Sequence, residues 1–261
     1  MEAKKAVSKT CVTAKVLEHG LIAGDVWSLV VAVPEIAKQT KPGQFVHIKI
    51  NDSLEPLLRR PFSIADCNAA QGTLTLIYRV VGRGTALMTK LQPGDTIDCM
   101  GPLGNGFALN AQRPLLVGGG MGLAPLLLLA RAFCSQPATM LMGGRNEQEL
   151  FWSNLYASVC KNIHITTDDG SVGQRGFTVD ALPELLASGK FDAVYACGPH
   201  IMLKGVAAIA TQYHIPCQVS MEDYMACGVG ACLSCTCAGT SGKRLKVCTD
   251  GPVFDAGEVV W

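Results

Sequence analysis

The sequence predicts a multidomain chain in which an antiparallel β-barrel precedes an α/β domain with a parallel sheet, followed by a small C-terminal cysteine loop region. Short alternating or β-branched runs occupy residues 1–109, and apolar strands alternate with helical segments across residues 110–218. Residues 219–261 are dominated by Cys and Gly and show little periodic hydrophobicity, so this region cannot bury enough surface to fold by itself.

The composition is that of a globular protein with no general affinity for polyanions. Hydrophobic residues make up 49% of the 261 residues and charged residues 16%, a balance that can bury a sizeable core and excludes a disordered chain. The 22 Lys and Arg residues against 21 Asp and Glu residues give a net charge of +1. We therefore expect no nucleic-acid partner.

The sequence shows no export or membrane signal. Its first residues lack an apolar run long enough for the core of a signal peptide. The most apolar stretch, residues 114–130, is shorter than the ~20 residues that a spanning helix needs. We expect a cytoplasmic protein with no membrane contact, whose 12 cysteines serve metals or redox chemistry rather than structural disulfides.

The first domain is expected to consist of strands interrupted once by a helix. Alternating or β-branched residues predict strands over 27–33, 44–50, 73–80 and 96–99. The Val and Thr alternation within residues 1–16 suits a further strand, and residues 85–91 can form one short helix that ends before Pro93. The alternation alone is compatible with an antiparallel barrel or a sandwich.

From Pro114 the pattern changes to apolar strand, turn and helix. A strand over 115–117, a glycine loop and a helix over 124–133 come first. Further apolar strands are expected over 139–142, 163–166 and 193–196. Such alternation implies a parallel sheet covered by helices, with ligands bound in the loops that follow the strands.

Five cysteines crowd one short segment of the C-terminal region, and four of them have the spacing of metal ligands. Cys227-x4-Cys232-x2-Cys235, with Cys248 further on, matches the C-x4-C-x2-C…C pattern of plant-type [2Fe-2S] ligation. Four thiolates of this kind hold two irons, two on each. The sequence therefore predicts an iron–sulfur cluster bound by these four residues.

The other residues of this segment bear on the same interpretation. A loop around a cluster turns backbone N–H groups toward sulfur, which requires the positive φ angles that Gly228 and Gly230 tolerate. The alternative is structural zinc, but no second C-x-x-C or His pair accompanies the half-site Cys232-x-x-Cys235. Cys237 should face away from Cys235 in an extended segment, so we expect it to pack rather than to bind metal.

Three segments of the first domain carry groups suited to a dinucleotide. The segment 59–63, Arg-Arg-Pro-Phe-Ser, follows an apolar strand and sets guanidinium groups beside a hydroxyl, which suits a diphosphate or a flavin edge. Tyr78 ends a strand and can stack on a ring, while the amides of Gly84 and Thr85 open the short helix and can hold phosphate oxygens. An arginine that only solvates a loop is the alternative for the first segment.

These motifs resemble the flavin barrel of the ferredoxin-reductase superfamily, which carries an Arg-x-x-Ser motif and a later Gly-Thr or Gly-Ser at a helix start. Arg60 to Ser63 and Gly84-Thr85 occupy those motif positions. The resemblance implies FAD bound across nine residues: Arg60, Pro61, Phe62, Ser63, Ile77, Tyr78, Arg79, Gly84 and Thr85.

A glycine-rich turn follows the strand at 115–117. It contains Gly118, Gly119, Gly120 and Gly122. The amides of this turn and the start of the following helix suit a pyrophosphate. The turn departs from the G-x-G-x-x-G fingerprint, because Leu123 stands at the third glycine position. A tight turn that binds no ligand is the alternative. In the ferredoxin-reductase superfamily such a turn accompanies a later Cys-Gly-Pro, here Cys197, Gly198 and Pro199. The resemblance implies that Cys197 lies near the nicotinamide and flavin rings, and a buried small thiol is the alternative.

The loop at 142–146 is expected to meet the adenosine ribose of a nicotinamide cofactor. Arg145 would favour the 2′-phosphate of NADP, whereas Glu147 would favour the free 2′-hydroxyl of NAD. The sequence leaves this choice open.

The order of barrel, nucleotide domain and cysteine loop resembles one family of the superfamily, the electron-transfer subunits of NAD-dependent dihydroorotate dehydrogenase B. The resemblance covers nearly the whole chain and is most specific over 221–232 and 247–254. It implies that a separate FMN-containing catalytic subunit oxidises dihydroorotate in de novo pyrimidine (UMP) biosynthesis, and that electrons pass through the [2Fe-2S] cluster and FAD to the co-substrate NAD⁺. It further implies a heterotetramer of two plus two subunits, with no catalytic residue for the substrate on this chain.

Two alternatives remain open at this point. The first is another flavin and iron–sulfur reductase of the superfamily, such as an NADPH-ferredoxin or sulfide-linked subunit. An aspartate at the position of Cys248 would have favoured that reductase, whereas Cys248 matches an all-cysteine cluster. A non-catalytic zinc or redox-sensing module would lack a flavin spectrum and any diaphorase activity.

Overall fold

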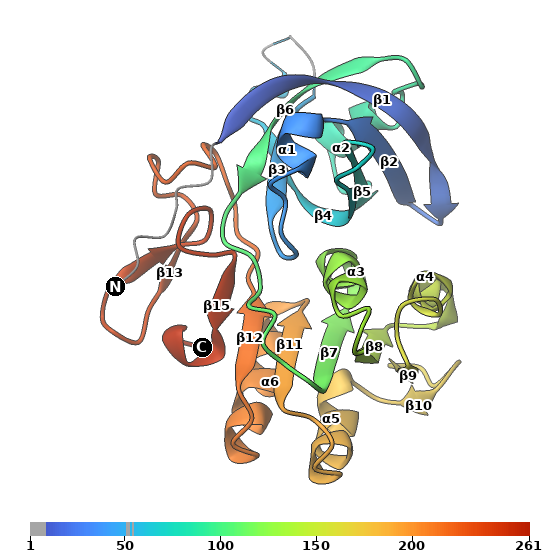
Figure 1. Ribbon diagram of the computed structural model, residues 1–261, viewed down its shortest axis with the longest axis vertical. Coiled ribbons are helices and arrows are strands. Elements are labelled where there is room, and N and C mark those ends of the chain that lie inside the picture. The colour runs from blue at the N-terminus through green and yellow to red at the C-terminus, as the bar shows by residue number, and fades with distance from the viewer. Residues whose placement is uncertain (1–8, 51–52, 54) are drawn as a thin grey trace.

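The computed structural model describes residues 9–50, 53 and 55–261. A barrel lies at one end, an α/β sheet domain at the other, and the C-terminal region packs beside both (Figure 1). Within these residues no helix has the length and apolar character needed to cross a bilayer. The strand expected within residues 1–16 begins at Thr10, and the part of that expectation that falls on residues 1–8 lies outside the described residues.

Six antiparallel strands close into a barrel, which confirms the predicted barrel and excludes the sandwich. They are β1 (Thr10–Ala23), β2 (Val26–Ala32), β3 (Phe45–Lys49), β4 (Arg60–Asn68), β5 (Thr73–Arg79) and β6 (Thr96–Leu103). The strand order is β1-β2-β5-β4-β3-β6, and β6 pairs with β1 to complete the ring. Alternate side chains, such as Val46 and Ile48 of β3, fill the interior with apolar groups.

Two short helices accompany the barrel strands. These are α1 (Pro34–Ala37) and α2 (Arg83–Met88). The sequence predicted the second helix over 85–91, which is two residues late at its start. Its end differs because Lys90 and Leu91 donate their N–H groups to carbonyls only three residues back, at 3.2 and 3.0 Å, and so form turns rather than helix.

A seven-stranded sheet forms the second domain, and its parallel part was predicted. The parallel strands are β7 (Pro114–Gly119), β8 (Thr139–Gly144), β9 (Asn162–Thr167), β10 (Gln174–Arg175), β11 (Ala193–Cys197) and β12 (Cys217–Ser220). The order is β10-β9-β8-β7-β11-β12-β15, and β15 (Val253–Asp255) runs antiparallel to β12. The sheet therefore includes one strand from the C-terminal region.

Helices cover both faces of this sheet. On one face lie α3 (Leu123–Ala132) and α4 (Trp152–Tyr156), and on the other α5 (Thr178–Ala187) and α6 (His200–Gln212). Neighbouring residues of β7 divide between the two layers, because Leu116 packs with α3 and α4 whereas Leu115 and Val117 pack with α5 and α6. Three 3₁₀ helices complete the fold: η1 (Gly120–Gly122), η2 (Glu147–Leu150) and η3 (Ala256–Glu258).

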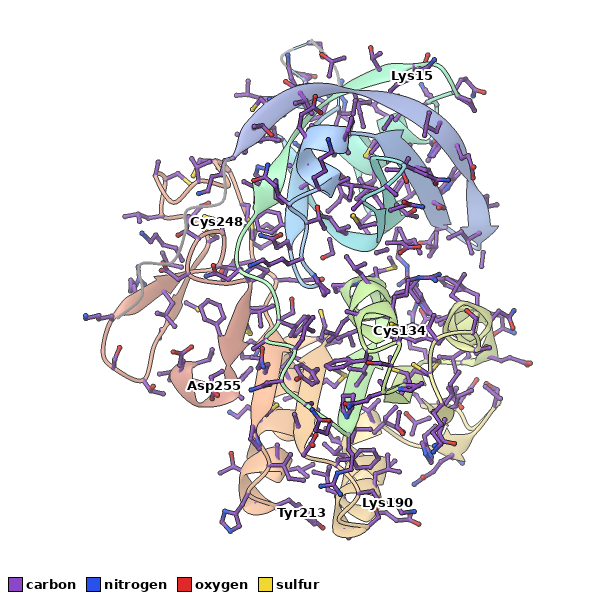
Figure 2. The ribbon with its side chains drawn as sticks, viewed as in Figure 1. Lys15, Cys134, Lys190, Tyr213, Cys248 and Asp255 are labelled. Carbon is purple, nitrogen blue, oxygen red and sulfur yellow. The ribbon has the colours of Figure 1, made fainter. Side chains whose placement is uncertain are left out.

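The C-terminal region folds onto the two larger parts. Its strands β13 (Thr236–Ala238) and β14 (Arg244–Lys246) pair antiparallel. Cys248 lies where this region meets the barrel (Figure 2), in one apolar cluster with Phe45 and Leu103 of the barrel and Val219 of the sheet. The region therefore shares a core with its neighbours, as expected for a segment with too little apolar surface to fold alone.

Candidate functional site

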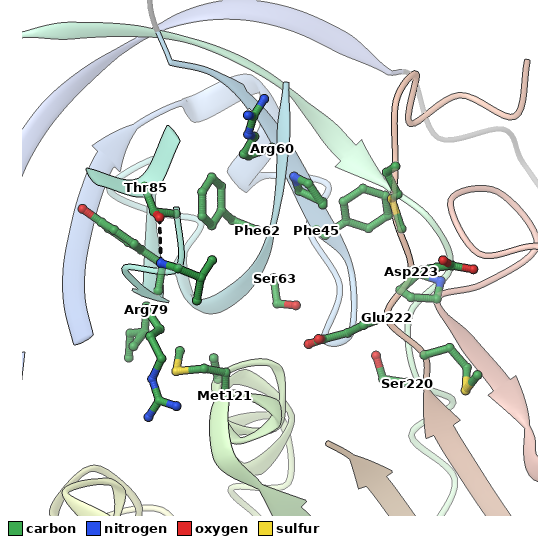
Figure 3. A pocket seen from close by; sticks show the side chains of 18 residues that line it. Phe45, Arg60, Phe62, Ser63, Arg79, Thr85, Met121, Ser220, Glu222 and Asp223 are labelled. Carbon is green, nitrogen blue, oxygen red and sulfur yellow. Dashed lines mark hydrogen bonds between the residues drawn. The ribbon is translucent and has the colours of Figure 1, made fainter. Parts of the chain in front are cut away.

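A cavity of about 340 Å³ lies between the barrel and the α/β domain (Figure 3). Eight of the nine residues predicted to bind FAD line it: Arg60, Pro61, Phe62, Ser63, Ile77, Tyr78, Arg79 and Thr85. The ninth, Gly84, packs behind them, because a Cβ at this position would lie 2.9 Å from Arg60 Nε. The glycine lets the start of α2 approach the guanidinium group.

The first of these motifs follows the apolar strand β3 in the chain, as expected, and itself opens the next strand, β4. Ser63 pairs with Phe45 and Phe62 with Val46, so residues 60–63 open β4 beside β3. The preceding apolar strand, β3, is their partner across the sheet. Pairing across the barrel, which a linear pattern does not display, therefore fixes the direction of Arg60 and Ser63.

Tyr78 is fixed in this cavity by His19 of β1. The His19 ring is stacked on that of Tyr78, with centroids 6.2 Å apart, and its Nδ1 donates to the Leu91 carbonyl at 2.9 Å. His19 Nε2 must then be the acceptor for the Tyr78 hydroxyl, also at 2.9 Å. Burial raises the pKa of Tyr78, so the hydroxyl stays protonated and the ring keeps its orientation.

Thr85 shapes the loop that leads into α2. Its Oγ1 accepts the N–H groups of Val81 at 2.9 Å, drawn as a dashed line in Figure 3, and of Gly82 at 3.2 Å. The same hydroxyl donates to the Gly82 carbonyl at 3.0 Å. The Thr85 hydroxyl therefore holds the loop together beside the cavity that Val81 and Thr85 line.

A second cavity, of about 300 Å³, adjoins the first and contains most of the predicted nicotinamide residues. Gly119, Gly120, Gly122, Gly198 and Pro199 line it. The two cavities share four residues: Arg79, Met121, Met221 and Glu222. Ligands in these two cavities would therefore meet at a common boundary.

Gly118 and Cys197, also predicted for this site, lie beneath its floor. A Cβ on Gly118 would lie 2.5 Å from Leu123 Cδ2, so Gly118 permits packing of α3 on β7. Cys197 is fully buried, burial raises the pKa of its thiol, and a Cβ on Gly122 would lie 2.4 Å from its carbonyl oxygen. Cys197 is therefore a buried thiol beneath the second cavity and does not contribute to its lining.

A third cavity, of about 420 Å³, extends from the glycine turn along the carboxyl ends of β8 and β9. Arg145 lines it together with Glu149 and Asp168, while Glu147 does not. Arg145 Nε and Nη2 donate to Glu149 Oε1 at 2.9 and 2.5 Å, and this pairing lowers the pKa of Glu149. Asp168 and Arg145 therefore line this cavity in different states. The Asp168 side chain lies at the cavity, and the Arg145 side chain is hydrogen-bonded to Glu149.

Sequence reasoning missed several residues that line these cavities. The segment Ser220–Asp223, at the end of β12, lines the first cavity opposite the barrel (Figure 3). Surrounding protein desolvates the Glu222 carboxyl and raises its pKa, although the side chain faces the open cavity. The sequence could have indicated Glu222 and Asp168 as cavity residues. Each of them closely follows an apolar strand of a parallel sheet, the position where such sheets bind ligands.

The cysteine loop folds around a sulfur atom. Cys227 Sγ accepts the N–H groups of Val229 at 3.4 Å, Ala231 at 3.3 Å and Cys232 at 3.4 Å. Positive φ angles of +68° at Gly228 and +83° at Gly230 allow this course. Amides that converge on a thiol sulfur are the environment that an iron-bound thiolate needs, so these residues fit a cluster.

The four predicted ligands form two neighbouring pairs. Cys232 donates its N–H to Cys227 Sγ at 3.4 Å, and burial, followed by the neighbouring Cys235, raises the pKa of Cys248. Hydrogen bonds, chiefly with Ser234, lower the pKa of Cys232 to about 6. Over residues 9–50, 53 and 55–261, no three His, Cys, Asp or Glu side chains converge as they would around a single metal ion. The pairing suits two irons with two thiolates each.

Cys237 lies apart from this arrangement. It is in β13, half-buried against the core that contains Val247, and pairs with Leu245 of β14. Its environment is that of a packing residue.

Family models match three consecutive parts of the chain. An oxidoreductase FAD-binding domain matches residues 13–107, and an oxidoreductase NAD-binding domain matches residues 116–208. The iron–sulfur cluster binding domain of dihydroorotate dehydrogenase B matches residues 222–260. Each match falls on a part of the fold that holds one of the sites above.

Curated relatives share nearly the whole chain. The dihydroorotate dehydrogenase B (NAD(+)) electron transfer subunit of Bacillus caldolyticus is 42% identical over 254 residues, 94% of this chain and 96% of that protein. The subunit of the same description from Desulforamulus reducens is 36% identical over 255 residues, 95% of this chain and 97% of that one.

Solved structures share the fold. A structure of NADH-dependent reduced ferredoxin-NADP oxidoreductase superposes with a TM-score of 0.85 at 33% identity, over 95% of this chain and 90% of that one. The ferredoxin reductase of carbazole 1,9a-dioxygenase has a TM-score of 0.69 at 22% identity, over 81% and 68% of the two chains, and supports the fold alone.

Proposed function

This chain belongs to the family of dihydroorotate dehydrogenase B electron transfer subunits, and from that premise we propose how its three sites divide the electron transfer. The chain is an oxidoreductase subunit that binds FAD, an iron–sulfur cluster and NAD, and it carries electrons between a catalytic partner subunit and NAD⁺. In this role it serves pyrimidine biosynthesis, and oxidation of dihydroorotate takes place on the partner.

One observation carries the assignment of the sites, namely the position of the segment Ser220–Asp223. The segment lines the flavin cavity, and Met221 and Glu222 also line the nicotinamide cavity. The chain then reaches Cys227 only four residues after Asp223. A short stretch of backbone thus touches all three proposed sites, which supports a continuous route for electrons through this chain.

We assign FAD to the cavity between barrel and sheet. Arg60 would pair with the diphosphate, Ser63 would hydrogen-bond a polar edge of the flavin, and Tyr78 would pack on an apolar face. FAD exchanges electrons singly with an iron–sulfur cluster and in pairs with a nicotinamide, while the protein sets its orientation and electronic environment.

We assign the nicotinamide cofactor to the two cavities at the carboxyl ends of the sheet strands. Gly119 and Gly120 would bring backbone amides to its pyrophosphate, and the boundary formed by Met121 and Glu222 would hold its ring beside the flavin. Cys227, Cys232, Cys235 and Cys248 would hold the [2Fe-2S] cluster, two thiolates on each iron.

The partner is the catalytic subunit that the family name implies. We propose that it carries FMN and that two copies of each subunit form the assembly.

The experiment is the visible absorption spectrum of anaerobically purified protein before and after NADH, with flavin and iron quantified. It is run with the chain alone and with the FMN subunit added. We expect flavin bands with a cluster shoulder, bleached by NADH, and bleached by dihydroorotate only when the partner is present.

Other outcomes would redirect the assignment. A colourless protein that contains zinc would overturn it. A coloured protein that is indifferent to dihydroorotate with the partner present would move the function to another flavin and iron–sulfur reductase of the same fold.

A further inference from the structure

His47 is a fully buried histidine whose ring nitrogens have no hydrogen-bond partner within the described part of the chain. Burial, and then the charge of Arg59, lower its pKa to about 4, so the imidazole is neutral at pH 7 and carries one N–H. Buried polar groups in native proteins are almost always hydrogen-bonded. The position of this ring indicates what its partner is.

His47 lies on the outer face of β3. Val46 and Ile48 point into the barrel core, whereas Phe45 packs in the cluster that contains Cys235 and Cys248. Residues two apart in a strand share a face, so His47 points the same way as Phe45. Its ring is inserted between the barrel and the cysteine region.

The ring contacts the cysteine loop directly. A Cβ on Gly228 would lie 2.7 Å from His47 Nδ1 and 3.0 Å from its Cε1. Gly228 follows Cys227, whose sulfur already accepts three backbone N–H groups of this loop. The glycine therefore lets the loop backbone close over the imidazole, and brings a buried N–H donor to a loop organised around sulfur.

We propose that His47 donates its N–H to a sulfur atom of the iron–sulfur centre beneath the loop 227–235, and so raises the reduction potential of the cluster. The inference rests on the cluster proposed above. A hydrogen bond to sulfur stabilises the more negative, reduced state, and such bonds are among the factors that set cluster potentials.

The same ring lies next to the flavin cavity. Phe45, which lines that cavity, makes a T-shaped contact with His47, with ring centroids 6.0 Å apart and planes at 78°. His47 thus stands between the two proposed redox sites. Its hydrogen bond would set the free-energy difference for the electron step between them.

Two substitutions test the proposal. His47→Phe keeps a planar ring of similar size without an N–H, whereas His47→Asn retains an N–H donor near the Nδ1 position, the ring nitrogen that lies against Gly228. The cluster potential is measured by anaerobic redox titration with EPR detection, and the FAD potential of the same samples serves as the internal reference.

We expect His47→Phe to make cluster reduction about tenfold less favourable, which is about 59 mV for a one-electron couple. The FAD potential should stay unchanged, and His47→Asn should return the cluster potential toward the wild-type value. A His47→Phe protein with full iron content and the wild-type cluster potential would overturn the proposal.

A second measurement avoids dependence on the stability of the variants. Pulsed EPR of the reduced wild-type cluster, with isotope-labelled histidine nitrogen, should reveal a coupled histidine nitrogen. The coupling should survive in the control His164→Phe, since His164 is exposed on β9 of the other domain. If wild-type protein contains iron and a bleachable flavin but shows no such coupling, the proposed role of His47 is wrong and the cluster assignment stands. If wild-type protein contains no iron, the cluster assignment itself is wrong.

Discussion

Arg145 is an exposed side chain that forms an ion pair with Glu149 four residues later. The sequence offers Arg145 as a ligand for a 2′-phosphate, and in the structure its guanidinium donates to Glu149 at 2.9 and 2.5 Å. Asp168 presents a carboxylate to the same cavity. A carboxylate accepts hydrogen bonds from a ribose diol and repels a phosphate, so these charges favour NAD over NADP.

We predict that Asp168→Ala reduces the preference for NADH over NADPH about tenfold, equivalent to about 1.4 kcal/mol, because one hydrogen bond to a charged group is lost. The measurement is the ratio of kcat/KM values for the two cofactors with an artificial electron acceptor. Glu147→Ala is the matched control, since Glu147 does not line the cavity, and it should leave the ratio unchanged. An unchanged ratio in Asp168→Ala would assign the preference to other residues.

At the scale of elements, the sequence predicted the strands that have a regular hydrophobic period and the loops that have a local residue pattern. The barrel strands and the parallel strands have their own periodicity, and the glycine turn and the cysteine spacing are local patterns. The strand β15 was not expected, because three residues are too few for a period and their pairing with β12 depends on how the region docks. The approach of the sheet domain to the barrel likewise brings Ser220–Asp223 to the first cavity, and folding of the barrel places Gly84 of α2 behind Arg60 of β4.

The cysteine loop permits a matched test within one element. We predict that Cys232→Ser lowers the iron content of the purified protein severalfold and removes the cluster EPR signal. Cys237→Ser should retain both, because Cys237 packs in β13 outside the paired thiols. Iron and labile sulfide analysis of the two variants decides the ligand set, and full cluster content in Cys232→Ser would contradict it.

At the scale of the whole molecule, the three sites are contiguous and one end of the series faces solvent. Cys232 is exposed, and near it Tyr224 is 89% and Leu233 60% exposed. Large apolar side chains at this exposure suit a surface that another protein covers. The cluster end of the molecule is therefore the natural place for the catalytic partner to deliver electrons.

We predict that Tyr224→Ala weakens binding of the catalytic subunit by about 2 kcal/mol, about thirtyfold in Kd, as expected for an aromatic anchor in an interface. Leu21→Ala is the control, since Leu21 is 58% exposed near the end of β1 of the barrel and outside the cysteine region. Titration calorimetry with cluster-loaded protein gives both values. Equal affinities of the two variants would place the partner on another surface.

The lengths of the outermost strands of the seven-stranded sheet have a consequence for association. Its two edges are formed by β10, with two residues, and β15, with three, which are the shortest strands in the sheet. A long, straight edge would offer unpaired N–H and C=O groups as a template for strands of other chains. Because β15 covers β12 and the chain turns away at once into η3, the cysteine region also protects the sheet from aggregation by edge-to-edge pairing.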